Sequence, residues 1–91
     1  MRALVTGGAK RLGKEMAIFL AERGFDVAIH YHSSESSALE LVEYIKSNTG
    51  KNSIALRADL TKETEVLGLI ARASDQLGGP ITCLINNASI F

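Results

Sequence analysis

Short apolar runs alternate along the chain with longer segments in which apolar residues recur at helical spacing. Four of the short runs are rich in Val, Ile, Leu and Ala, and they occupy residues 2–6, 26–31, 52–58 and 81–87. Such runs are typical of strands that are buried on both faces of a sheet. The segments between them predict amphipathic helices, so the expected order of elements is β-α-β-α-β-α-β.

Three helices are predicted, at residues 12–23, 36–50 and 62–77. Their expected buried faces are Leu12, Met16, Phe19 and Leu20 in the first, Ala38, Leu41, Val42 and Ile45 in the second, and Val66, Leu67, Ile70 and Leu77 in the third. Gly24 stands where the end of the first helix favours a left-handed residue. The second stripe stops at Gly50, and Gly78-Gly79-Pro80 ends the third helix. Ser37 and Glu40 match a capping box, and Thr61 is the expected N-cap of the third helix.

The alternation of strands and helices also predicts the topology. Strands joined by single helices run parallel, and right-handed crossovers place the helices on both faces of the sheet. We therefore expect an α/β fold, a doubly wound parallel sheet of the Rossmann type with strand order 3-2-1-4. Residues 1–91 are interpreted as the N-terminal part of one such domain, because the apolar fourth strand would otherwise leave an uncovered sheet edge that invites aggregation.

Composition and charge narrow the choice of partners. The 91 residues include ten basic and ten acidic side chains, so no net field attracts nucleic acid or an anionic membrane. No apolar run reaches the roughly 18 residues that a membrane span needs, and the N-terminus lacks a signal-peptide layout. The single cysteine, Cys83, cannot form an internal disulfide, which fits a reducing compartment. These features predict a cytoplasmic protein that binds small molecules.

The segment "VTGGAKRLGKE" after the first strand matches two kinds of phosphate-binding loop. A nucleoside-triphosphate loop needs Ser or Thr after its lysine, whereas this chain has Glu15 there. A dinucleotide loop fits better, because the segment follows a strand and opens a helix. Gly7 and Gly8 allow a tight turn, and Gly13 allows close packing of the helix on the sheet. Arg11 stands where the middle glycine is usual, and its guanidinium could bind pyrophosphate. A plain turn with a solvated arginine stays the alternative.

The end of the second strand selects the nucleotide. NAD-binding proteins of this kind place an acidic residue there to bind the ribose hydroxyls. This chain instead has Tyr31, His32, Ser33 and Ser34, with no acid before Glu35. Hydroxyls, backbone amides and an imidazole would accept the 2′-phosphate that a carboxylate would repel. The sequence favours NADP over NAD as cofactor.

A metal site is not predicted. His30 and His32 share a strand face, but no third ligand is evident, and a catalytic zinc site takes three ligands from the protein.

Together these residues resemble the short-chain dehydrogenase/reductase family over nearly the whole chain, in "TGGAKRLG", "HYHSS", "ADL" and "NNAS". The chain is most similar to the pteridine reductases, which also have Arg in the glycine loop and Ser after Asn-Asn-Ala. The resemblance implies a cofactor site formed by Gly7, Arg11, Leu12, Gly13, Tyr31, His32, Ser33, Ser34, Asp59, Leu60, Asn87, Ala88 and Ser89. Asp59 and Leu60 would flank the adenine, and Asn87, Ala88 and Ser89 would lie along the nicotinamide-side ribose and phosphates. Ser33 departs from the subgroup, in which Arg is expected.

Catalysis in this family requires a Tyr-x-x-x-Lys pair, in which the lysine lowers the tyrosine's pKa. Tyr31 is followed four residues later by Glu35 and Tyr44 by Asn48, so neither tyrosine matches. We therefore expect the 91-residue chain to be inactive, as the cofactor half of an NADP-dependent reductase. The intact enzyme would be a homo-oligomer that transfers hydride to a carbonyl or C=N bond, such as that of a pteridine. The alternative is a stand-alone nucleotide-binding module without catalysis.

Overall fold

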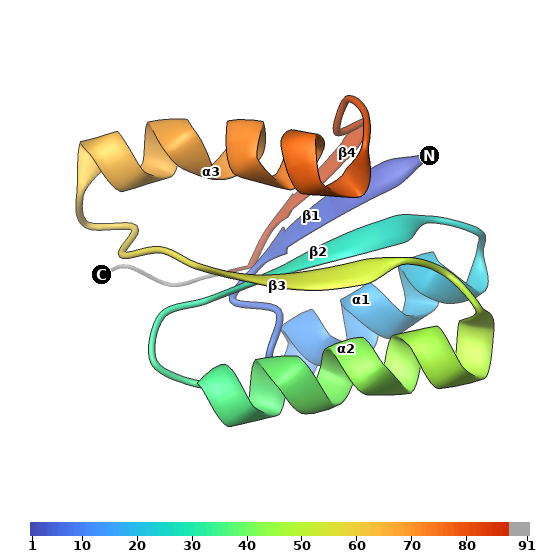
Figure 1. Ribbon diagram of the computed structural model, residues 1–91. Coiled ribbons are helices and arrows are strands. Elements are labelled where there is room, and N and C mark those ends of the chain that lie inside the picture. Colours follow the sequence, from blue (N-terminus) through green and yellow to red (C-terminus); the bar gives the residue numbers. More distant parts are fainter. Residues whose placement is uncertain (88–91) are drawn as a thin grey trace.

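A computed structural model describes residues 1–87, which form four strands and three helices (Figure 1). The elements are β1 (Arg2–Thr6), α1 (Arg11–Glu22), β2 (Asp26–Tyr31), α2 (Glu35–Thr49), β3 (Ser53–Arg57), α3 (Glu63–Leu77) and β4 (Cys83–Asn86). Each predicted element is present, and the third and fourth strands are one to two residues shorter at their ends than the apolar runs suggested.

All strands are parallel, and their order in the sheet is β3-β2-β1-β4. Helices α1 and α2 cover one face of the sheet, and α3 covers the other (Figure 1). This is the doubly wound arrangement predicted from the sequence, and the fold prediction is confirmed. Strand β1 lies between β2 and β4 in the sheet. The order of the strands therefore reverses at β1.

Successive residues of each strand supply the cores on opposite faces of the sheet. Val5, Val27 and Ile29 are fully buried against α1 and α2. Leu4 and Ala28, the neighbours of these residues, are fully buried against α3. A sheet covered on both faces explains why the strands appear in the sequence as continuous apolar runs.

The predicted buried face is confirmed for α2 and is only partly correct for α1, in which Met16 and Leu20 are half-buried and Leu20 packs against the core. All four predicted α2 residues are buried, whereas Leu12 and Phe19 of α1 are 64% and 51% exposed. The buried residues of α1 are Gly13, Ala17 and Ala21. Small side chains occupy this face because the helix backbone approaches the sheet closely near the glycine loop, and large side chains would not fit.

The same kind of correction applies to α3. Leu77 is buried as predicted, but Val66, Leu67 and Ile70 are exposed. The helix instead packs on the sheet through Leu69, Ala73 and Leu77. The wide apolar surface of α3 made two neighbouring faces possible from the sequence, and only packing selected one of them.

Two helix starts also differ from the prediction. Helix α2 begins one residue after Ser34, with no side-chain cap bond, so Ser37 lies inside the helix and does not form the expected capping box. Helix α3 begins after Lys62. Thr61 is not its N-cap, because the Thr61 hydroxyl and amide both donate to the carboxylate of Asp59. The left-handed conformation predicted for Gly24 is confirmed, and Gly50 and Gly78, which follow the other two helices, also have positive φ.

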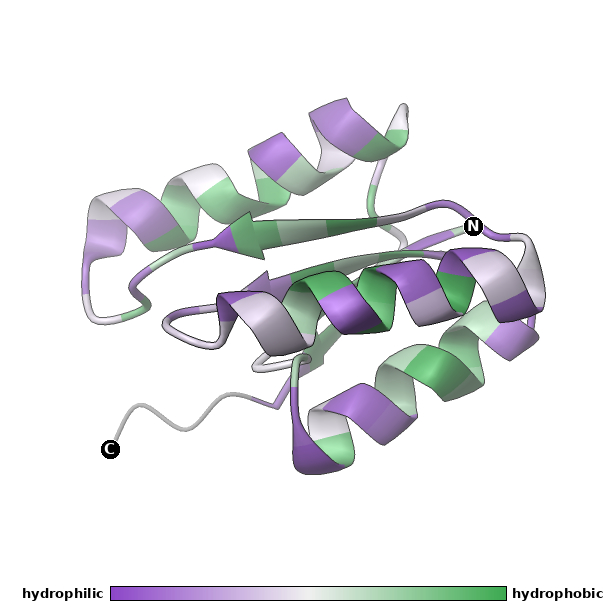
Figure 2. Cartoon of the chain, turned by 60° about the horizontal axis from the view of Figure 1, so that its bottom comes forward, coloured by the Kyte–Doolittle hydropathy of each residue, from purple (hydrophilic) through white to green (hydrophobic). Residues whose placement is uncertain are grey.

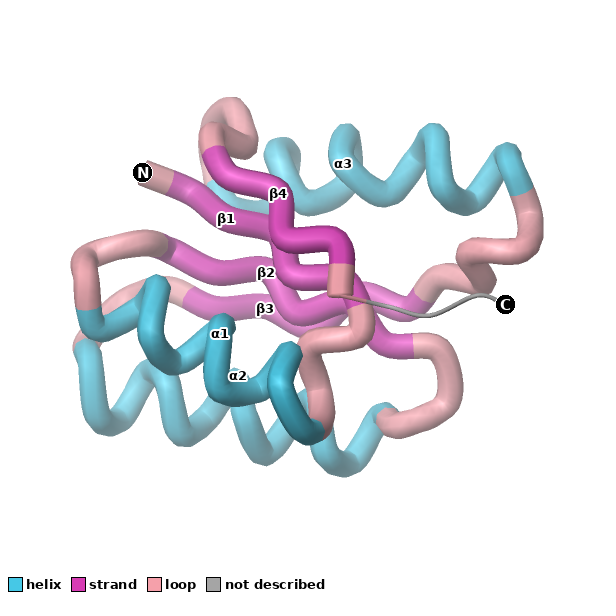
Figure 3. Tube along the Cα trace, turned by 180° about the vertical axis from the view of Figure 1, so that it is seen from behind, coloured by secondary structure: helices cyan, strands magenta, loops and turns pink. Residues whose placement is uncertain are grey.

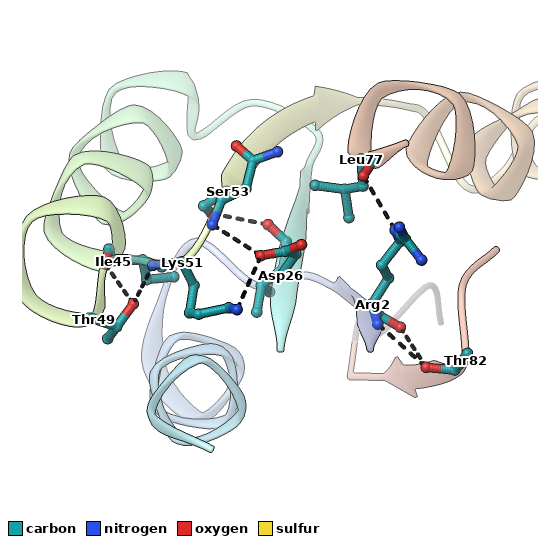
Figure 4. A network of polar contacts seen from close by, with 10 residues as sticks. Arg2, Asp26, Ile45, Thr49, Lys51, Ser53, Leu77 and Thr82 are labelled. Carbon is teal, nitrogen blue, oxygen red and sulfur yellow. Dashed lines mark hydrogen bonds and ion pairs between the residues drawn. The ribbon is translucent and has the colours of Figure 1, made fainter. Parts of the chain in front are cut away.

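Polar contacts tie together the amino ends of the strands, opposite the glycine loop (Figure 4). The Arg2 side chain donates to the carbonyl groups of Leu77 and Gly78 at the end of α3. Asp26 accepts a hydrogen bond from the amide of Asn52 and lies 3.8 Å from Nζ of Lys51. These contacts stabilise the sheet at the amino ends of its strands. None of them involves the carboxyl ends, where the glycine loop lies.

Strand β4 is an edge strand with no neighbour on its outer side within residues 1–87 (Figure 3). Leu84 is 52% exposed on one face. On the other face, Ile85 lines an apolar hollow together with Met16, Phe19 and Leu20 of α1. Figure 2 shows hydrophobic residues along α1 as well as in the sheet. Among the described residues, no helix has the length and apolar character needed to cross a membrane.

Candidate functional site at the carboxyl edge of the sheet

The segments singled out in the sequence meet at the carboxyl ends of the strands. Gly7 follows β1, His32 follows β2, Ala58 follows β3 and Asn87 follows β4. In a parallel sheet these carboxyl ends all lie on the same side. Ligands of doubly wound sheets bind beside the carboxyl ends, at the point where the order of the strands reverses.

The loop between β1 and α1 is a tight turn held by its neighbours. Gly7 has φ of +62°, a conformation that an L-residue adopts only at a cost. The amide of Gly8 donates to the carbonyl of His30 at 3.1 Å, so the turn is bound to β2. The loop thereby keeps one shape and leaves its outer side open toward the start of α1.

Arg11 occupies the middle-glycine position in the conformation of a glycine. Its φ is +57°, and it is the only non-glycine residue with positive φ among the described residues. A left-handed residue with a Cβ costs about 1–2 kcal/mol. The arginine is exposed at the N-terminus of α1, where unpaired amides and the helix dipole also favour an anion.

Gly13 is the point of closest approach in the site. A Cβ added there would overlap the carbonyl oxygen of Gly7 and would lie 2.6 Å from Nδ2 of Asn87. Asn87 itself donates from Nδ2 to the Gly7 carbonyl at 3.2 Å, and from its amide to Oγ1 of Thr6 at 3.0 Å. The absence of a side chain at Gly13 therefore allows β4 to hold the glycine turn.

A small hollow lies between the glycine turn and the end of β2. Its lining residues are Gly7, Ala9, Lys10, His30, Tyr31, His32, Ser33 and Ser34. Lys10 is the one cation of fixed charge in this lining, and no carboxylate belongs to it. The hollow therefore combines Lys10 with the hydroxyls of Ser33 and Ser34 and the imidazole of His32, groups that bind phosphate.

Tyr31 contributes differently from its neighbours. Its ring is buried in the core against α1 and α2, and its hydroxyl donates to the carboxylate of Glu35 at 3.2 Å. Burial raises the pKa of Tyr31, and the bond to Glu35 acts in the same direction. This hydrogen bond therefore fixes both the Tyr31 hydroxyl and the carboxylate of Glu35, the first residue of α2.

Asp59 follows β3 and has one carboxylate oxygen engaged by the chain. Its Oδ1 accepts from the Thr61 hydroxyl and amide, and its Oδ2 lies 4.0 Å from Nε2 of His32. The hydrogen bonds from Thr61 hold the pKa of Asp59 below its usual value, so the side chain is an anion at neutral pH. Leu60, the next residue, is half-buried beside the α3 core.

His30 is a buried side chain with both ring nitrogens engaged. Nδ1 accepts a hydrogen bond from the amide of Gly7 at 2.9 Å, and Nε2 lies 2.9 Å from the carbonyl oxygen of Ala58. Burial lowers the pKa of His30, so the ring is neutral at neutral pH. Residues 1–87 contain no group of three His, Cys, Asp or Glu side chains suited to a metal ion.

The remaining predicted site residues fall into two groups. Leu12 lies in the first turn of α1 with its side chain exposed, so only its backbone is placed beside the loop. Ala88 and Ser89 lie outside the described residues. The other predicted site residues, from Gly7 to Asn87, lie together at the carboxyl ends of the strands.

Two residues of the site were missed from the sequence. Lys10 was passed over although it belongs to the glycine loop, where a cation next to a phosphate site is a usable signal. His30 was considered only as a metal ligand. Its position inside an apolar run was the available sign that it is buried and hydrogen-bonded.

The doubly wound fold and the residues at the carboxyl ends of its strands define a Rossmann-type α/β protein. The sequence pattern of the family described as short chain dehydrogenase matches residues 1–91. The chain therefore belongs to the short-chain dehydrogenase family.

Individual relatives agree with this assignment. The alternative dihydrofolate reductase FolM from Brucella canis, solved with NADP, is 43% identical with a TM-score of 0.89, over 99% of this chain and 35% of that one. A short chain dehydrogenase from Burkholderia cenocepacia, also in complex with NADP, is 40% identical with a TM-score of 0.92, over 99% and 36% of the two chains.

Relatives differ in how much of their length this chain covers. It spans about 35% of several curated relatives. One of them, the 3-oxoacyl-[acyl-carrier-protein] reductase FabG from Staphylococcus epidermidis, is 40% identical over 97% of this chain. A short-chain dehydrogenase/reductase homolog, YusS from Bacillus subtilis, is 42% identical over 97% of this chain and 79% of its own length.

Proposed function

We propose that this chain is the N-terminal, cofactor-binding part of an NADP-dependent short-chain oxidoreductase. The observation that carries the proposal is the glycine turn, held from both sides by His30 and Asn87 against the N-terminus of α1. When bound, NADPH supplies the hydride that reduces a carbonyl or C=N bond in the intact enzyme.

The residues present fit a dinucleotide. A Cβ at residue 13 would not fit between the loop and α1. Gly13 therefore allows the loop and the helix to approach each other as closely as pyrophosphate binding requires. Arg11 and the first amides of α1 would face the phosphates. Asp59, anionic and with Oδ2 free of Thr61, would accept from the adenine amino group.

The hollow at the end of β2 supports NADP over NAD. Lys10 lies in it with Ser33 and Ser34, and it supplies the cation that Ser33 does not. Glu35 is bound to the Tyr31 hydroxyl, which keeps its carboxylate from the ribose. Two solved relatives are complexes with NADP.

A pteridine or dihydrofolate is the substrate we infer for the intact enzyme. The FolM likeness supports it, as do Arg11 in the glycine loop and Ser89 after Asn86-Asn87-Ala88. Other carbonyl substrates are the broader class to which this proposal belongs.

We further propose that residues 1–91 form part of a single larger domain in a homo-oligomeric, cytoplasmic enzyme. The β4 edge, which has no neighbouring strand within residues 1–87, and the apolar hollow beside α1 support this, because a further strand and helix would bury both. The alternative, a stand-alone nucleotide-binding module, is favoured by the short relative YusS. A reading frame that continues into a Tyr-x-x-x-Lys sequence supports the enzyme.

The test compares binding and turnover. The full-length protein should bind NADPH more tightly than NADH and oxidise NADPH with dihydrofolate or dihydropterin. The 91-residue chain should show no NADPH oxidation, because it lacks the tyrosine–lysine pair. Dissociation constants from fluorescence titration and absorbance at the nicotinamide band give both results. Tighter binding of NADH would contradict the cofactor assignment, and turnover by the 91-residue chain would contradict the position of the catalytic groups.

Arg11 provides a prediction in which binding and stability separate. Arg11→Ala and Arg11→Gly should each weaken NADPH binding by about 1–3 kcal/mol, because both remove the guanidinium from the phosphates. Only Arg11→Gly relieves the left-handed strain, so it should unfold with a free energy up to about 1 kcal/mol higher than the Ala variant. Equal affinity of wild type and variants would place the Arg11 side chain in solvent, away from the cofactor.

A further inference from the structure

His30 connects two loops that lie far apart in the sequence. Its ring receives the amide of Gly7 from the β1–α1 loop and reaches the carbonyl of Ala58, the residue after β3. The side chain is 2% exposed. Under the proposed function, the first loop would receive the pyrophosphate and the segment after Ala58 would receive the adenine.

The partners of the ring determine its protonation. A backbone amide can only donate, so Nδ1 must carry a lone pair, and a carbonyl can only accept, so Nε2 must carry the proton. Only the neutral ring with hydrogen on Nε2 satisfies both neighbours. Protonation of Nδ1 would set its N–H against the Gly7 amide.

Both polar backbone groups of Gly7 form hydrogen bonds within the protein. Its amide donates to His30 and its carbonyl accepts from Asn87 at 3.2 Å. A turn fixed in this way before the ligand arrives spares the ordering cost that a flexible loop would incur on binding.

We propose that His30 is a positioning residue for the dinucleotide. Its neutral imidazole keeps the Gly7 turn in the shape that would receive the pyrophosphate, through the lone pair on Nδ1, while the proton on Nε2 anchors the ring to the carbonyl of Ala58. This inference rests on the proposed function. It differs from a purely structural role because it assigns separate consequences to the two ring nitrogens.

Two variants separate these nitrogens in the full-length protein. The Oδ1 of His30→Asn can replace Nδ1 as acceptor for the Gly7 amide, while the longer side chain of His30→Gln can replace Nε2 as donor to Ala58. We expect His30→Asn to keep the Kd for NADP⁺ within about threefold of wild type, and His30→Gln to raise it about tenfold or more. Calorimetric titration measures both, with thermal unfolding as the control for folding.

The outcomes distinguish this inference from the proposed function. A wild type that binds neither NADP⁺ nor NAD⁺ contradicts the function, and the inference with it. A wild type that binds NADP⁺, while His30→Gln binds equally well or both variants lose affinity equally, contradicts the inference alone. An Asn variant that does not fold also contradicts it.

A pH series on wild type and His30→Asn decides the question if the Gln variant does not fold. Since burial lowers the pKa of His30 from its ordinary value, the neutral ring is lost only under acidic conditions. The Kd of wild type for NADP⁺ should therefore rise more than that of His30→Asn between about pH 7.5 and 5. Lys10, His32 and Asp59, the charged or titratable groups around the ring, are common to both proteins. Parallel profiles would overturn the proposal.

Discussion

Replacing Gly13 by Ala should abolish tight cofactor binding and destabilise the fold. The added Cβ would overlap the Gly7 carbonyl and crowd Nδ2 of Asn87. Backbone atoms cannot rotate away as a flexible side chain can, so α1 must move off the loop and the Asn87–Gly7 bond must break. Overpacking of this kind costs about 1–3 kcal/mol or more of unfolding free energy. We expect the Kd for NADPH to rise by about 10- to 100-fold, since the loop would lose its shape.

The same substitution at another glycine is the matched control. Gly68 lies inside α3, and a Cβ added there would meet no atom within 4 Å. Gly68→Ala should raise the unfolding free energy by about 0.5–1 kcal/mol, because alanine is the better helix former, and leave NADPH affinity unchanged. Chemical denaturation and fluorescence titration measure both quantities. A Gly13→Ala variant that behaved like Gly68→Ala would show that loop and helix are not in close contact.

Enlarging Ala17 should have the second large effect. Ala17 is fully buried in the middle of α1, between Gly13 and Ala21. Ala17→Leu adds three carbons where the helix lies close to the sheet, and it should lower the free energy of unfolding by about 1–3 kcal/mol. In a chain of this size that change is a large part of the total stability. Thermal or denaturant unfolding of the 91-residue chain measures it.

The apolar residues that the sequence pattern selected in α1 supply the contrast. Phe19 is 51% exposed, and its ring contacts the Arg23 guanidinium at 3.7 Å. Phe19→Ala should cost less than about 1 kcal/mol in the 91-residue chain, because little burial and one exposed cation–π contact are lost. If Phe19→Ala proved more destabilising than Ala17→Leu, the predicted apolar stripe would be the packed face after all.

The sequence alone determined the order of elements, the parallel sheet and the position of the glycine turn. These follow from strong local signals. Buried strands must be continuously apolar, single-helix crossovers force parallel pairing, and a turn such as Gly7-Gly8 tolerates few other residues. The stripe of α2 was predictable for the same reason, since Ala38, Leu41, Val42 and Ile45 share one helical face and all four are buried.

The buried faces of α1 and α3, and the surroundings of Lys10 and His30, depend on how the elements pack together and were not predictable from the sequence. Hydrophobic periodicity reports where apolar side chains lie around a helix, and α1 and α3 carry more of them than one sheet face can cover. The choice depends on how closely each helix approaches the sheet, which for α1 is set by Gly13 against Gly7 and Asn87. His30 and its two partners, Gly7 and Ala58, come from three separate strand ends, and no local pattern encodes a meeting of residues 7, 30 and 58.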